Sequence, residues 1–187
     1  TSIEIEARNV RYEYFAELIR QENIDLVLLA HHRNDQAETS FMRLIKGAGF
    51  VGLSGMKELR DHHYYRPLLN ISKEDILSYS IVNEIQYRED ETNKETIYQR
   101  NKIRNQILPL IEEINPSYQD ALIHLGNISL QTIALLDDNF SHIKNNWQNS
   151  GEVDLTSLSS KAYLSLVVSY ILDKEIIHKE QVADILK

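Results

Sequence analysis

The stretch that decides the fold is Leu26-Val27-Leu28-Leu29-Ala30-His31-His32-Arg33-Asn34-Asp35, in which five apolar residues are followed directly by two histidines. A short, continuous apolar run is typical of a strand buried on both faces, as in parallel sheets. A helical pattern begins at about Asp35. In open α/β sheets, ligands bind beyond the carboxyl ends of the strands. His31, His32 and Asp35 therefore stand where an α/β enzyme usually has its chemistry.

Helical patterns and short strands alternate on both sides of this stretch. Apolar residues spaced three and four apart indicate helices, and short runs of aromatic or apolar residues indicate strands. The predicted helices are Ile5–Asn23, Asp35–Lys46, a helix from the N-cap Ser72 to about Asn83, and Tyr98–Leu108, interrupted by Pro109; the predicted strands are Leu26–Ala30, Tyr64–Arg66 and Gln86–Tyr87. This alternation predicts an α/β fold with a parallel sheet flanked by helices.

After Asn115-Pro116 the pattern becomes purely helical. One long apolar periodicity covers residues 117–146, and further helices are expected over 161–172 and 179–187. We therefore predict two domains, an α/β domain over 1–110 and a small all-helical domain over 111–187.

The composition narrows the class of protein. Hydrophobic residues make up 42%, the net charge is −8, and there is no cysteine, which excludes disulfides and thiolate catalysis. No segment approaches the roughly 20 apolar residues of a membrane span, so we expect a cytoplasmic protein without membrane contact. The chain starts at Thr1 rather than methionine and ends inside an amphipathic pattern, so we expect it to be an excerpt of a longer protein.

An acidic chain is a poor general binder of nucleic acid, because phosphate contacts dominate that affinity. A local basic cluster lies between Arg88 and Arg104. Within it, Arg100 and Arg104 are four residues apart and so share one face of a helix. Guanidinium groups suit phosphates. Pairing with Glu91 or Glu95 on a solvated face is the equally weighted alternative.

The polar residues around His31 also allow simpler interpretations. Asn34 or Asp35 could cap a helix, and Glu38 suits the positive end of a helix without any catalytic role. His31 and Asp35 could form a metal pair, but no second histidine cluster completes such a site. The glycine-rich loop from Gly47 to Met56 could let the backbone approach a ligand or could simply let the chain turn.

Together, these motifs resemble the tRNA(Ile)-lysidine synthetase family. The resemblance is strong over residues 4–110 and faint afterwards, and it depends on the order of the motifs rather than on any single one. The matching pieces are Glu6-Ala7-Arg8-x-x-Arg11-Tyr12, His31-His32-x-x-Asp35-Gln36-Ala37-Glu38-Thr39, Arg43-Leu44, Gly47-x-Gly49, Gly52-Leu53, Arg66-Pro67-Leu68-Leu69, Asp90-x-Thr92-Asn93 and Arg100-Asn101-x-Ile103-Arg104.

The resemblance implies an N-type ATP pyrophosphatase fold and a two-step ligation. ATP, with Mg²⁺, would adenylate the C2 oxygen of the wobble cytidine of tRNA(Ile), and the amine of free L-lysine would displace AMP. By matching position, His31 and Asp35 would be catalytic. The residues implied to contact substrate, ATP or tRNA are His32, Glu38, Arg66, Asn93, Arg100, Asn101 and Arg104. A homodimer is a further possibility, and no metal ligands can be assigned.

One departure from the family concerns the phosphate loop. The family binds pyrophosphate through a Ser-Gly-Gly-x-Asp-Ser loop, whose backbone N–H groups face the phosphates, and these 187 residues contain no such sequence. We therefore expect the chain by itself to be catalytically incomplete. The alternatives are a non-catalytic module that binds tRNA or a partner chain, and a related tRNA-modifying enzyme such as a thiolase. The absence of cysteine argues against sulfur transfer.

Overall fold

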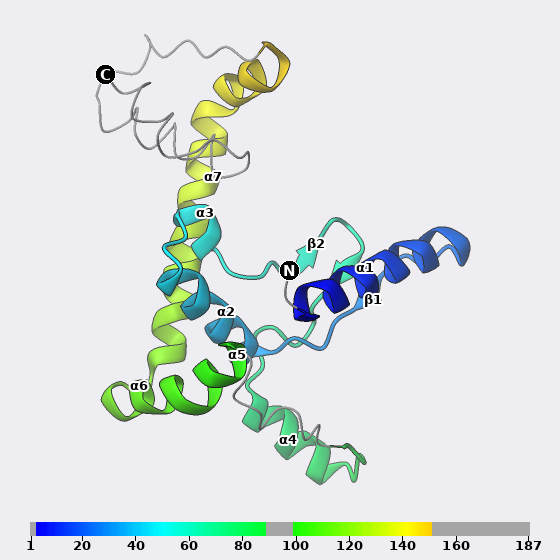
Figure 1. Ribbon diagram of the computed structural model, residues 1–187, viewed down its shortest axis with the longest axis vertical. Helices are drawn as coiled ribbons and strands as arrows, with labels where there is room; N and C mark the ends of the chain where they lie inside the picture. Colours follow the sequence, from blue (N-terminus) through cyan, green and yellow to red (C-terminus); the bar gives the residue numbers. More distant parts are fainter. Residues whose placement is uncertain (1–2, 89–98, 151–187) are drawn as a thin grey trace. The chain divides into compact units, whose positions relative to one another are not determined.

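The computed structural model describes residues 3–88 and 99–150 (Figure 1). The elements are α1 (Ile3–Gln21), β1 (Val27–Leu28), α2 (Arg33–Ile45), α3 (Phe50–Leu53), β2 (Leu59–Arg60), β3 (Tyr64–Tyr65), α4 (Lys73–Val82), α5 (Gln99–Lys102), the π-helix Ile103–Ile107, α6 (Leu108–Ile114) and α7 (Tyr118–Ser150). Two compact units result, one from residues 1–36 and 56–90, the other from 37–55 and 91–187. Helix α2 begins in the first unit and continues into the second. The predicted domain boundary near residue 110 stays a prediction.

The sheet of the first unit has three strands in the order β1-β3-β2. β1 pairs in parallel with β3, so that Val27 lies opposite Tyr64 and Leu28 opposite Tyr65. β2 and β3 form an antiparallel hairpin. The prediction of a parallel arrangement is therefore confirmed for β1 and β3 only, and the sheet as a whole is mixed. The short turn between β2 and β3 is the reason, because two strands joined by so few residues can only run antiparallel.

Helix α1 covers one face of this sheet. Tyr12 packs edge-on against Tyr64, with ring centroids 5.0 Å apart. The guanidinium of Arg60 lies 4.7 Å from the centroid of the Tyr12 ring. Val27, Tyr64 and Arg60 are register partners, so α1 covers the face from which these three side chains project.

The other face of the sheet contradicts the expectation of a strand buried on both sides. Leu28 in β1 is 66% exposed, and Leu26, just before β1, is 46% exposed. Leu59, on the same face as Leu28, is 46% exposed. The physical reason is that α1 covers one face, and nothing in the described part of the first unit covers the opposite one.

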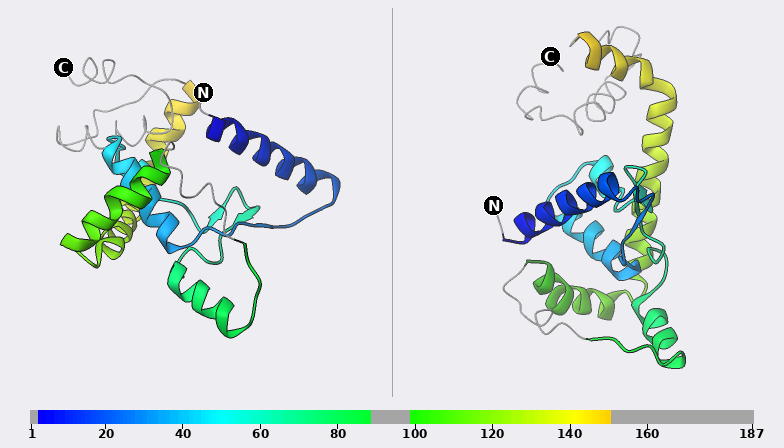
Figure 2. Two further views of the ribbon diagram at one scale, coloured as in Figure 1. Left: turned by 60° about the horizontal axis from the view of Figure 1, so that its bottom comes forward. Right: turned by 90° about the vertical axis from the view of Figure 1, so that its right-hand side faces the viewer.

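The core of the second unit lies between the 99–114 helical segment and the start of α7. Ile103, Leu108 and Tyr118 are buried in one cluster, with Phe41 and Met42 of α2 packed against it. Further toward the carboxyl end of α7, around Gly126, helix α3 packs against α7 (Figures 1 and 2). A side-chain carbon at Gly126 would lie 3.4 Å from the Leu53 carbonyl oxygen. This is ordinary van der Waals contact, so Gly126 lies in the face of α7 that packs against the end of α3.

The glycine-rich loop of residues 47–56 uses its glycines for turns and packing. Gly47 and Gly55 have φ of +72°, a conformation that disfavours residues with a side chain. One Nη of Arg43 donates hydrogen bonds of 2.8 Å to the carbonyl oxygens of Gly52 and Gly55. Of the two interpretations of this loop, the structure supports the turn.

The segment 99–114 continues as a helix past Pro109, where the sequence predicted an interruption. The helix is not broken at Pro109, which occupies the first turn of α6 directly after the π-helix. Proline lacks an N–H and clashes with the carbonyl four residues earlier in an α-helix, and the wider π turn relieves both problems. In a π-helix, residues five apart share one face, so Ile103 and Leu108 both reach the same core.

Most of the other predicted elements are confirmed. α1, α2, α4 and α7 match predicted helices within a few residues, and Ser72 is the N-cap of α4. The predicted strand Gln86–Tyr87 is wrong, because these residues follow α4 as irregular chain. The helices predicted over 161–172 and 179–187 lie outside the described residues. None of the helices within 3–88 and 99–150 combines the length and apolarity that a membrane crossing requires.

Candidate active site

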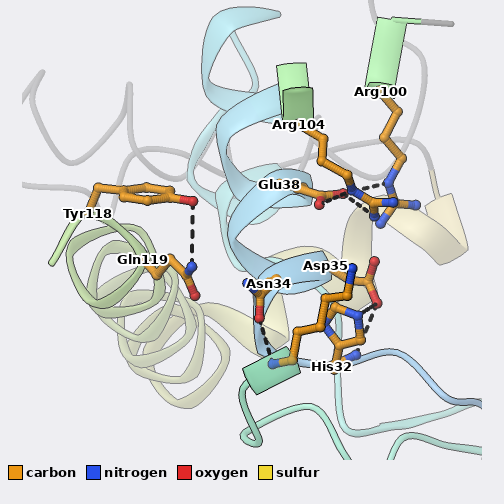
Figure 3. A network of polar contacts seen from close by, with 9 residues as sticks. His32, Asn34, Asp35, Glu38, Arg100, Arg104, Tyr118 and Gln119 are labelled. Atoms are coloured by element: carbon orange, nitrogen blue, oxygen red, sulfur yellow. Dashed lines mark hydrogen bonds and ion pairs between the residues drawn. The ribbon is translucent and has the colours of Figure 1, made fainter. Parts of the chain in front are cut away.

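His32 and Asp35 meet at the start of α2, where the chain leaves β1. The backbone N–H of His32 donates a 3.1 Å hydrogen bond to Asp35 Oδ2, and Nε2 of the His32 ring lies 3.5 Å from the same oxygen (Figure 3). Asp35 is 9% exposed. The sequence predicted catalytic roles for His31 and Asp35 and a binding role for His32, and these roles stay predictions; the structure shows that the His32 ring is close to the Asp35 carboxylate.

The position of Asp35 is compatible with both roles considered from the sequence, helix capping and catalysis. A carboxylate at the third helical position that accepts the N–H of the residue before the helix is one half of a capping box. Asp35 therefore does cap its helix. The same oxygen also faces the imidazole, and within the described residues Nδ1 of His32 is buried without a hydrogen-bond partner. A carboxylate beside a histidine can orient the ring, favour its protonated form or bind a cation.

The site lies at the carboxyl ends of the two parallel strands. His31 and His32 follow β1, and Arg66 follows β3. Because β1 and β3 are parallel neighbours, their carboxyl ends lie at the same edge of the sheet. The sequence argument that placed His31 and His32 at the carboxyl end of a parallel strand is thus supported, and Arg66, which was predicted as the last residue of a strand, directly follows β3.

Arg66 is deeply buried, with 2% exposure. One Nη donates a 2.7 Å hydrogen bond to the Lys57 carbonyl oxygen, and its backbone N–H donates to the Glu58 carbonyl oxygen at 2.8 Å. Its Nε has no hydrogen-bond partner in the described chain. Arg66 therefore holds the β2–β3 hairpin from inside. The predicted contact of Arg66 with a ligand stays a prediction, and the burial leaves little surface for a large ligand.

Glu38, Arg100 and Arg104 form a second cluster, within the second unit. Arg104 donates from Nε to Glu38 Oε1 at 2.6 Å and from Nη2 to Oε2 at 2.9 Å, and Arg100 donates from Nε to Oε2 at 2.9 Å (Figure 3). The Glu38 side chain is 3% exposed, while those of Arg100 and Arg104 are 33% and 30% exposed. A carboxylate bound by a forked guanidinium and a second arginine is strongly stabilised as an ion.

This cluster was only half foreseen from the sequence. The spacing of Arg100 and Arg104 correctly placed them on one face, and both bind Glu38, more than 60 residues earlier. The alternative partners Glu91 and Glu95 lie outside the described residues, so that pairing stays a prediction. The long apolar periodicity around Glu38 could have signalled a buried helix, in which an acidic residue needs a cation. Asn101 is half-buried beside Arg100. Asn93 lies outside the described residues.

Gln36, to which the sequence gave no role, and Asn34, which it considered only as a helix cap, also organise the site. The side-chain amide of Gln36 accepts from Met56 N–H at 2.8 Å and donates to Met56 O at 3.1 Å, which ties α2 to the end of the glycine-rich loop. Asn34 binds the start of α4. Within the described residues, no group of three or more histidine and acidic side chains is arranged to hold a metal ion.

Comparisons with known proteins agree with one another. A family model described as a PP-loop domain matches residues 1–111. Three similar proteins are each named tRNA(Ile)-lysidine synthase. They come from Porphyromonas gingivalis (43% identical over 122 residues), Clostridium tetani (43% over 127) and Francisella tularensis subsp. tularensis (36% over 138).

These matches cover 65%, 67% and 72% of this chain, but only 27%, 27% and 35% of the respective relatives. The chain thus spans about a quarter to a third of the length of the curated relatives it matches. The matched residues include His32 and Asp35 at the start of α2, Arg100 of α5 and Arg104 of the π-helix. On the family match, which covers more than half of its residues, the chain belongs to the PP-loop domain family.

Proposed function

We propose that this chain forms part of an enzyme that ligates lysine to C2 of the wobble cytidine of tRNA(Ile) with ATP. The observation that carries the proposal is the agreement between the family match over 1–111 and three relatives of the same name at 36–43% identity. The geometry adds support, because a histidine–carboxylate pair lies where the parallel strands β1 and β3 end.

The proposed reaction has two steps. The C2 oxygen of cytidine attacks the α-phosphorus of ATP, and pyrophosphate leaves. The lysine amine then attacks C2 and AMP leaves, with loss of a proton from the nitrogen. In this scheme Asp35 holds a positive charge near the reacting base, and the His32 ring beside it accepts or relays a proton.

The chain offers one carboxylate, that of Asp35, as a ligand for Mg²⁺. Mg²⁺ in nucleotide sites is commonly held by one or two carboxylates together with phosphate oxygens and water. Asp35 is the one carboxylate that we assign to this role, and the other ligands would come from ATP and water. When bound, the ion would neutralise charge on the phosphates.

The roles proposed for Arg100 and Arg104 need refinement. In the structure both bind Glu38, so their first role is to compensate a buried carboxylate. Both arginine side chains remain about one-third exposed beside Glu38, so a phosphate group can approach their guanidinium groups. We keep contact with ATP or tRNA as a proposal for these two residues and for Asn101.

The test is lysine transfer by a full-length protein that contains these residues. We expect labelled lysine to enter a tRNA(Ile) transcript with cytidine at the wobble position, with one AMP and one pyrophosphate formed per lysine. The matched control is the same transcript with uridine at that position, which should accept no lysine. Binding of tRNA without formation of AMP would instead favour a non-catalytic module, and modification without lysine would favour a different tRNA-modifying enzyme.

A further inference from the structure

Asn34 does not cap its own helix. It is the second residue of α2, yet its side-chain oxygen Oδ1 accepts the backbone N–H of Lys73, the first residue of α4, at 2.9 Å (Figure 3). The first N–H groups of a helix have no partner inside that helix and need an outside acceptor. Asn34 supplies that acceptor from a position 39 residues earlier in the chain.

A second hydrogen bond runs beside the first. The backbone N–H of Arg33 donates to the carbonyl oxygen of Ile71 at 2.9 Å. Two bonds between adjacent residues of α2 and the 71–73 segment restrict rotation as well as translation. A single bond would leave the start of α2 free to turn about it.

The segment that receives these two bonds is itself well fixed. Ser72 Oγ accepts the N–H of Asp75 at 3.0 Å and donates to its carboxylate at 2.6 Å. Ile71 N–H donates to Leu68 O at 2.9 Å, and Leu69 is buried with 5% exposure. The start of α4 can therefore serve as an anchor for the start of α2.

The residue that follows Asn34 is Asp35, whose carboxylate contacts His32. We propose that Asn34 is a positioning residue, which fixes the His32–Asp35 pair by binding the first turn of α4. The inference rests on the proposed function for its catalytic meaning. Its structural content, that loss of this contact moves His32 and Asp35, can be tested without any activity.

Asn34→Leu removes the acceptor at nearly constant size, and Asn34→Asp restores an acceptor oxygen. Ser80→Ala is the matched control, because it removes the hydrogen bond from Ser80 Oγ to the Ile76 carbonyl oxygen within α4 and leaves Asn34, Ser72 and Lys73 in place. The first readouts are amide hydrogen exchange at Lys73 and the NMR resonances of the His32 ring. We expect Asn34→Leu to lose protection at Lys73 and to shift the His32 ring signals, and Asn34→Asp to restore both. Ser80→Ala should leave both the protection at Lys73 and the His32 signals unchanged.

The second readout is lysine transfer by the full-length protein. Because small misplacements of catalytic groups are costly, we expect Asn34→Leu to lower turnover by roughly 10- to 100-fold, with a smaller effect on the KM for tRNA. Unchanged His32 signals in Asn34→Leu would overturn the positioning role, whatever the activity. Shifted His32 signals in a protein that never transfers lysine would keep the positioning role and reject the proposed function.

Discussion

Helix α2 carries two acidic side chains with opposite surroundings. Asp35, in its first turn, contacts His32, a residue three positions away, and accepts one backbone N–H. Glu38, one turn later, is 3% exposed and is bound by two arginines that lie more than 60 residues further along the chain. The first pair is local and partly open to solvent. The second is a long-range cluster around a buried charge.

The comparison of Asp35 with Glu38 points to two different roles for an acidic residue, one in substrate chemistry and one in stability. The carboxylate of Asp35 and the ring of His32, at the end of a parallel strand, can bind and orient a substrate. A buried carboxylate that two guanidinium groups neutralise links distant segments, and removal of either side leaves an unpaired charge. We therefore expect substitutions at Asp35 to act on rate and substitutions at Glu38 to act on stability.

The largest expected effect is that of Asp35→Asn in the full-length protein. An amide oxygen can still accept the His32 N–H, so the melting temperature should change little. The lost charge should lower the rate of lysine transfer by roughly 10²- to 10⁴-fold. Asp75→Asn, at the equivalent position of α4, is the control and should leave the rate unchanged. Nearly full turnover in Asp35→Asn would reduce Asp35 to a helix cap.

Next in size is the loss of stability in Glu38→Ala. This change leaves Arg100 and Arg104 without their shared carboxylate, but both are about one-third exposed and can be partly rehydrated. We expect the free energy of unfolding to fall by about 2–3 kcal/mol, less than for a fully buried pair. Urea unfolding measures it, with the exposed Glu58→Ala as the control. Equal losses of unfolding free energy in Glu38→Ala and Glu58→Ala would show that the buried carboxylate contributes no more to stability than the exposed one.

A smaller effect should distinguish the two arginines. Arg104 makes two hydrogen bonds to Glu38 and Arg100 makes one. Arg104→Met should therefore destabilise the protein by about 1 kcal/mol more than Arg100→Met. The KM values for ATP and tRNA, measured beside the unfolding curves, test the proposed phosphate contact. A loss of affinity at constant stability would show that substrate contact dominates for these two residues.

The smallest effect concerns an exposed carboxylate, Glu58. The hydrogen bond from Tyr65 Oη to Glu58, at 3.1 Å, and the negative charge of Glu58 raise the pKa of Tyr65 above its ordinary value. Because the pKa is raised on folding, the stabilisation is complete below the ordinary tyrosine pKa of about 10 and is lost as the pH rises through the higher value. An NMR titration should show a lower Tyr65 pKa in Glu58→Gln. An unchanged pKa would exclude Glu58 as the cause.

Local signals in the sequence predicted local structure well. Apolar spacing located α1, α2, α4 and α7, and Ser72 located the start of α4. The same reasoning erred at β1, because an apolar run predicts burial only if something covers both faces, and Leu28 is 66% exposed. It also expected Pro109 to interrupt the helix, since the π-helix that accommodates this proline depends on packing rather than on local propensity.

In the candidate site, too, the contacts between residues close in sequence could be predicted, and those between distant residues could not. Position after a strand was enough to find His32 and Asp35, which are neighbours in sequence. Glu38 and its arginines could be named, but not paired, because no local pattern links residues so far apart. Asn34 was considered only as a cap of its own helix, and its true partner, Lys73, depends on how the chain returns to α2.

The π-helix at Ile103–Ile107 fixes the direction in which the arginine side chains point relative to the direction in which Leu108 points. Arg100, before the π-helix, and Arg104, in its first turn, bind Glu38; directly after it, Leu108 enters the core with Tyr118. An α-helix turns by about 100° per residue, so one residue more or less between them would rotate one face by that angle relative to the other. The segment can therefore accept many substitutions of side chain, but it should accept no change in length.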